Sequence, residues 1–111
     1  MTRSFAFLIS LLMPVSALAH SCDADARQKA KALLELHFGG KDGENGMSIG
    51  IDDEVKTLAP MKALKGEGKF DVLEVWGHIY KADYRMRLIY ARIAGDCLLM
   101  GQEVIEASDP Y

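Results

Sequence analysis

Apolar residues recur at helical spacing in the segment that follows residue 22, and this pattern predicts the first element of the chain. The recurring positions, three or four residues apart, are Ala26, Ala30, Leu33, Leu34 and His37. Charged residues occupy the opposite face of the predicted helix. Two glycines follow it, and glycine readily adopts the left-handed conformation that commonly ends a helix. The pattern therefore predicts an amphipathic helix over Asp23–Phe38 that buries one stripe.

From Met47 onward the apolar pattern changes to alternation, which is typical of strands. The predicted strands, separated by clusters of turn-forming residues, cover residues 47–56 or beyond, 69–81, 84–93 and 97–106. Short connections make the last three strands an antiparallel meander, and the helix is available to cover one face of the sheet. The predicted fold class is α+β, with one N-terminal helix packed on a four-stranded antiparallel sheet.

The first nineteen residues have the order of a secretory signal peptide. A single positive charge precedes an apolar run over residues 5–13, and small residues stand at Ala17 and Ala19. The apolar run is too short to span a bilayer, so cleavage after Ala19 is favoured over retention as a membrane anchor. This interpretation assigns residues 1–19 to the signal peptide and residues 20–111 to a single globular domain, periplasmic or secreted.

Both cysteines of the chain, Cys22 and Cys97, fall in the part that remains after cleavage. An oxidising compartment lets a cysteine pair persist, which predicts one disulfide between the start of the domain and a point near its end. Closing a loop of this span stabilises the folded state by roughly 4 kcal/mol on the chain-entropy model. A redox or metal-binding pair is the alternative, although the chain has no Cys-x-x-Cys spacing.

The balance of charges argues against a nucleic-acid partner. Loss of Arg3 with the signal peptide leaves 13 − 1 = 12 basic against 16 acidic residues, a formal net charge of 12 − 16 = −4. No basic cluster is interleaved with aromatic residues, as binding to a phosphate backbone would favour. The sequence has no second apolar span and no phosphate-binding motif, so we expect no cofactor, no nucleic acid and no membrane span after signal removal.

Three short segments carry metal-binding residue types without completing a pattern. His20 would become the N-terminus, where an amine and an imidazole together can hold copper. Residues 42–46 look like the start of a calcium loop, but Met47 stands where that loop requires glycine. The acidic run at 52–54 is more simply a solvated strand edge. The sequence therefore predicts no metal site.

The two long central strands place alternate residues on opposite faces of the sheet. With residues 82 and 83 as a two-residue turn, His78 pairs with Arg87 and Trp76 pairs with Ile89, whereas a three-residue turn would break this grouping. One face then carries Leu73, Val75, Ile79, Met86, Leu88 and Tyr90, which suit packing under the helix. The opposite face carries Glu74, Trp76, His78, Tyr80, Arg85 and Arg87.

This second set of six residues is the candidate binding face of the sequence. Tryptophan, tyrosine and arginine commonly anchor partners, and arginine binds a carboxylate through two hydrogen bonds. The set predicts a surface for a protein or a small anionic ligand, or the contact of a homodimer. A structural interpretation is also open, in which Glu74 pairs with Arg87 while Trp76 and Tyr80 cover aliphatic neighbours on an open face.

One helix followed by four strands resembles the cystatin-like and NTF2-like arrangement, in which a curved antiparallel sheet wraps an N-terminal helix. The helical segment 30–34 and the long hairpin over 70–93 carry this resemblance. Inhibitory cystatins have a Gln-x-Val-x-Gly hairpin and a Pro-Trp loop; here the segment at Gln102 lacks the final glycine and Trp76 follows valine. The resemblance therefore implies no protease inhibition, and it points to small exported bacterial proteins of unknown function.

The leading functional hypothesis is a small exported, non-enzymatic binding module. The alternative is a small NTF2-like hydrolase or isomerase in which His78 acts as a base oriented by Glu74, Asp71 or Asp83. No serine or cysteine nucleophile stands in a recognisable motif. A single helix does not readily enclose a substrate cavity, while a broad sheet face readily presents a surface to a partner.

Overall fold

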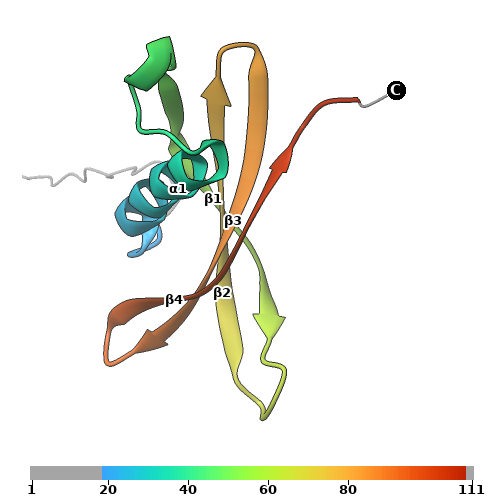
Figure 1. Cartoon of the computed structure of the whole chain (residues 1–111). Helices are drawn as coiled ribbons and strands as arrows, with labels where there is room; N and C mark the ends of the chain where they lie inside the picture. Colours follow the sequence, from blue (N-terminus) through green and yellow to red (C-terminus); the bar gives the residue numbers. More distant parts are fainter. Residues whose placement is uncertain (1–18, 110–111) are drawn as a thin grey trace, which may run out of the picture.

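The computed structural model describes residues 19–109 as one helix followed by a four-stranded sheet (Figure 1). Apart from Ala19, the predicted signal peptide lies outside the described residues. The elements in chain order are α1 (Asp23–Phe38), a short 3-10 helix η1 (Glu44–Gly46), β1 (Ile49–Lys62), β2 (Lys69–Ile79), β3 (Ala82–Ile93) and β4 (Asp96–Glu106). The α+β class and the order of elements are as the sequence predicts.

The four strands form one antiparallel sheet in the order β1-β2-β3-β4, a simple meander. The pairing of β1 with β2 is interrupted between Ile51 and Val55 and again between Leu58 and Met61. A further irregularity interrupts the pairing of β3 with β4 next to Ile89. Because bulges bend strands and increase their twist, these interruptions explain why the sheet is strongly twisted in Figure 1.

Helix α1 packs across one face of the sheet, mainly against β1 and β2. Its buried residues are Ala26, Ala30, Leu33 and Leu34, all of which belong to the predicted stripe. His37 does not belong to that stripe, because it is exposed and makes an edge contact with the ring of Phe38. Gly39, with a φ of 72°, ends the helix in the left-handed conformation. No helix within residues 19–109 is long and apolar enough to span a bilayer.

A close approach of α1 to β2 depends on Gly77. A Cβ atom at this position would lie 2.6 Å from Cδ1 of Leu34 and 2.9 Å from Cε of Met86. Both neighbouring side chains are fully buried, so neither has solvent-filled space into which it could move. The missing side chain of Gly77 therefore lets the helix settle onto the sheet.

A buried tyrosine fastens the first turns of α1 to β3. Tyr90 is fully buried, and its hydroxyl donates a 2.7 Å hydrogen bond to Oδ2 of Asp25. The ammonium group of Lys29 donates to both oxygens of the same carboxylate, at 3.0 and 3.2 Å. Burial acts to raise the pKa of Asp25, but these hydrogen bonds outweigh it and leave the pKa below its ordinary value. Burial, with the bond to Asp25, raises the pKa of Tyr90.

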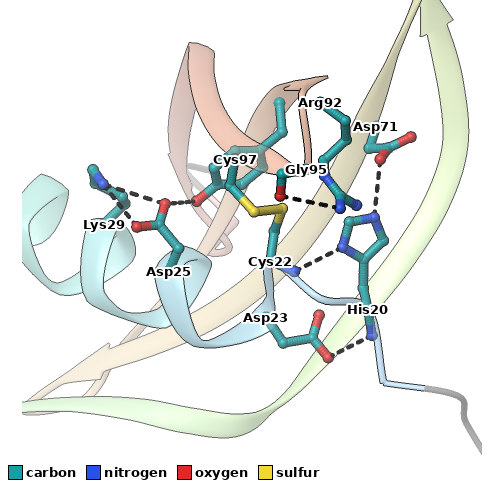
Figure 2. Close-up of a disulfide and its surroundings, with 10 residues drawn as sticks. His20, Cys22, Asp23, Asp25, Lys29, Asp71, Arg92, Gly95 and Cys97 are labelled. Carbon is teal, nitrogen blue, oxygen red and sulfur yellow. Dashed lines mark hydrogen bonds and ion pairs between the residues drawn. A yellow bond between two sulfur atoms is a disulfide. The ribbon is translucent and has the colours of Figure 1, made fainter.

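The predicted disulfide between Cys22 and Cys97 is present, with the two Cα atoms 5.9 Å apart (Figure 2). It joins the residue before α1 to β4, across 75 positions of sequence. His20 is held beside it, because its Nε2 lies 3.0 Å from Oδ2 of Asp71 and its Nδ1 accepts a hydrogen bond from the Cys22 amide. The start of the domain is thus attached to both β2 and β4.

Candidate binding face

The turn of the β2–β3 hairpin lies at residues 80 and 81, two residues earlier than the sequence analysis predicted. Ile79 pairs with Ala82, so His78 lies opposite Asp83 and Trp76 lies opposite Arg85. The predicted pairs of His78 with Arg87 and of Trp76 with Ile89 are therefore wrong. In the predicted register the partner of Glu74 would be Ala91; in the observed register it is Arg87, which supplies the opposite charge.

The assignment of residues to faces survives this error in register. Each residue of β2 pairs with a β3 residue four positions earlier than predicted, and an even shift leaves every side chain on its predicted face. The predicted inner residues Leu73, Val75, Ile79, Met86, Leu88 and Tyr90 are all buried. Tyr80 is the exception: it lies in the turn itself with a φ of 57° and is 89% exposed. The predicted turn at residues 82 and 83 would have placed Tyr80 opposite Arg85, but Arg85 lies opposite Trp76.

The remaining five residues of the set share the sheet face that α1 does not cover, which we call the outer face. At its centre is Glu74, only 8% exposed. Its Oε2 lies 3.6 Å from Nε of Arg87 and 3.9 Å from Nε of Arg85, while Trp76 donates a 3.3 Å hydrogen bond from Nε1 to Oε1. The two arginine Nε atoms are shielded from solvent without a hydrogen-bond acceptor among the described residues, so charge attraction holds this cluster.

His78 lies between two carboxylates at the other end of the outer face. Its Nδ1 is 2.7 Å from Oδ1 of Asp83, and its Nε2 is 2.8 Å from Oδ1 of Asp52. These hydrogen bonds, first that of Asp83 and then that of Asp52, raise the pKa of His78 above 6.5. The sequence suggested Asp83 as a partner but missed Asp52, which is 26 positions away and lies in the irregular part of β1.

A row of alternating charges crosses the outer face through all four strands. The register places Lys56 opposite Glu74, Glu74 opposite Arg87, and Arg87 opposite Glu103. We call these four residues the charged row. The two middle members form an ion pair, whereas within residues 19–109 neither Lys56 nor Glu103 has an ion-pair partner. The pair of Glu74 with Arg87 was one interpretation of the sequence and is confirmed, whereas Lys56 and Glu103 were missed because they join the row only once the register is known.

Two rows of apolar side chains lie next to the charged row on the same face. Leu58 pairs with Val72 and Val72 with Ile89, in the row toward the end of β1. Beyond them Met61 pairs with Phe70, and Ala91 pairs with Leu98. Met61 and Leu98 are 44% and 42% exposed. We call these residues the apolar rows. They make one half of the outer face apolar, while the other half carries the charged row and His78 with its carboxylates, together with Trp76 and Ile105.

Two hollows of the described surface are lined by none of the five candidate residues on the outer face. A groove of about 530 Å³ runs between α1 and β1, lined by Arg27, Lys31, Ile51 and Asp53 among others. A second, of about 380 Å³, lies beside the β2–β3 turn and includes Tyr80 but no other member of the candidate set. In the part of the chain that the structure describes, no group of three His, Cys, Asp or Glu side chains is placed to hold a metal ion.

Comparison with protein-family models, with curated proteins and with solved structures finds no match for this chain.

Proposed function

We propose that this chain is a small exported binding module that recognises a protein partner through the outer face of its sheet. The observation that carries the proposal is the cluster around Glu74. A half-buried tryptophan, Trp76, and two arginines, Arg85 and Arg87, are fixed around one buried carboxylate on a face that α1 leaves open. Large side chains that are already held in place lose little conformational freedom on binding, which suits them as anchors.

The charges of the cluster favour a protein over a small anion as the partner. The arginine side chains are still 32% and 36% exposed, so each can offer donors to an acidic group. Glu74, however, offsets part of their charge, and neighbouring apolar rows extend the surface well beyond the arginines. A broad surface with aromatic, charged and apolar parts suits a protein better than a small ion. A small anionic ligand remains the alternative partner.

The geometry gives less support to the hydrolase or isomerase alternative. His78 has both ring nitrogens engaged by carboxylates, and its raised pKa favours the charged imidazolium. A general base needs a free lone pair on one ring nitrogen at the working pH. The grooves between α1 and β1 and beside the turn do not include His78. The Cys22–Cys97 disulfide is consistent with an oxidising compartment and supports the periplasmic or secreted location.

Photo-crosslinking in living cells tests whether the outer face meets another protein. A benzophenone amino acid replaces Ile105, an exposed residue that pairs with Arg85 on the outer face, in one variant and Leu36, an exposed apolar residue of α1, in a matched control. Both substitutions leave Trp76, Arg85 and Arg87 in place. We expect a protein adduct from position 105 and none from position 36. No adduct from position 105, or the same adducts from both positions, would refute a binding role for this face.

Once the adduct is identified, substitutions separate binding from catalysis. Trp76→Ala and Arg87→Lys, the second of which keeps the charge beside Glu74, should each weaken the complex by more than about fivefold. His78→Ala should change it less. The enzymatic alternative requires the opposite order, with His78→Ala lowering a rate by about two to four orders of magnitude while binding survives.

A further inference from the structure

We infer that the partner of the outer face is a second copy of this chain, packed face to face about a twofold axis that runs parallel to the strands. This inference rests on the proposed binding role of the outer face and names its occupant. It is carried by the order of charges in the charged row and by the position of the apolar rows beside it.

The charged row is complementary to itself under this symmetry. A twofold axis parallel to the strands reverses the strand order but keeps each row at the same height, so β1 faces β4 and β2 faces β3 of the second copy. Lys56 then faces Glu103 of the second copy, and Glu74 faces Arg87 of the second copy. Every contact along the row joins opposite charges. If the strand order of the second copy were not reversed, each strand would face the same strand of the other copy, and like charges of the row would meet.

The two members of the row that have no ion-pair partner in the described part of the chain are the ones that gain most from the second copy. Lys56 on β1 and Glu103 on β4 are separated by three strand spacings, about 14 Å, which is too far for an ion pair within one chain. Sheets packed face to face lie about 10 Å apart, a gap that a lysine and a glutamate extending toward each other can bridge. The second copy thus supplies a partner to each end of the row.

The same operation superposes the apolar rows. Met61, Phe70 and Leu98 of one copy come to lie over the apolar rows of the other, which removes partly exposed aliphatic and aromatic surface from water. The outer face from Phe70 to His78 is about 26 Å long and four strands, about 19 Å, wide. Two such faces bury roughly 1,000 Å², near the lower limit of specific interfaces, so we expect a weak, reversible dimer.

Reversal of single charges tests this arrangement. Lys56→Glu and Glu103→Lys each set two like-charged contacts across the twofold axis, and each should weaken self-association by at least about fivefold. An equal mixture of the two variants should recover association to within about twofold of the parent, because each reversed charge then meets its complement. Recovery cannot arise within one chain, because the two positions are about 14 Å apart.

Glu103→Lys also separates specific packing from general repulsion. It changes the charge of the cleaved chain from −4 to 13 − 15 = −2, so general repulsion alone would make association tighter rather than weaker. Lys41→Glu, a charge reversal in the loop after α1, is the control. It should leave association at the parent value apart from a small change in general charge repulsion. Lys56→Gln and Glu103→Gln, which are milder, should weaken association by about twofold to threefold if a reversal variant fails to fold.

The measurement is sedimentation equilibrium of the gene product purified in its disulfide-bonded form, up to roughly 100 µM, where a contact of this size is expected to be populated. A dimer that weakens with either reversal and returns in the mixture supports the inference. A monomer at all concentrations, a dimer indifferent to the reversals, or a mixture as weak as each variant alone overturns it. A monomer that still gives a photo-adduct with another protein from position 105 would refute the self-association while leaving the proposed binding role intact.

Discussion

Adding one methyl group at Gly77 tests how closely α1 and the sheet are packed. The Cβ atom of Gly77→Ala would lie 2.6 Å from Cδ1 of Leu34, 2.9 Å from Cε of Met86 and 3.2 Å from Cδ1 of Ile51. Leu34 and Met86 are fully buried, so relief requires movement of the helix or of core side chains. Overpacking of this kind costs about 1–3 kcal/mol.

A smaller, opposite effect comes from the unfolded chain. Replacing glycine by alanine restricts the unfolded state and by itself stabilises a protein by about 0.4–1 kcal/mol. The net expectation for Gly77→Ala is therefore a loss of about 1–2 kcal/mol in the free energy of unfolding. Gly50→Ala is the matched control, since Gly50 is also in a strand but its Cβ would meet only the carbonyl oxygen of His78, at 3.8 Å. The control should be neutral or slightly stabilising.

A second substitution shows whether the loss arises at the predicted contact. Leu34→Ala alone should cost about 2–5 kcal/mol because it leaves a cavity between α1 and β2. In the double variant the new methyl group enters that cavity, so the combined loss should be smaller than the sum of the single losses by about 1 kcal/mol or more. Urea denaturation of the four variants measures each value. A Gly77→Ala protein as stable as the parent would refute this account of the packing. A double variant whose loss in free energy of unfolding equals the sum of the two single losses would also refute it.

Two further predictions concern the ionisable groups. Tyr90→Phe should lower the free energy of unfolding by about 1–2 kcal/mol at neutral pH, because it removes the hydrogen bond to Asp25. The pKa of Asp25 is lowered in the folded state, so the stability that ionised Asp25 contributes is present above pH 3.8 and is lost as the pH falls below it. The difference in free energy of unfolding between the parent and Tyr90→Phe, measured by denaturation, should therefore become smaller in acid. Equal stability of the two proteins at neutral pH would contradict the prediction. For His78 the pKa is raised, so the stability from its ion pairs is complete below pH 6.5 and lost as the pH rises through the folded pKa. Titration by NMR should give His78 of the parent a pKa above 6.5. This pKa should fall in Asp52→Asn and stay unchanged in the control Asp53→Asn. A pKa at or below 6.5 in the parent would count against the observed contacts.

Local patterns in the sequence determined the helix and the faces of the strands. The stripe of α1 and the left-handed glycine at its end depend on residues close together in the chain, so Asp23–Phe38 could be predicted with its ends. Alternation along β2 and β3 assigned the inner and outer residues even though the turn was misplaced, because a shift by an even number of residues preserves the faces. The number and position of the cysteines were enough to predict the Cys22–Cys97 bond.

Tertiary structure decided which of the possible neighbours on the outer face were realised. The turn at Tyr80 selected the pair of Glu74 with Arg87, which the sequence offered as one interpretation, and the irregularity of β1 brought Asp52 to His78 across 26 positions of sequence. Alternation has a period of two and gives no information on which of several even registers two strands adopt. That choice depends on the fit of charges and core side chains across strands, as at Gly77, and this fit exists only once the helix and sheet have come together.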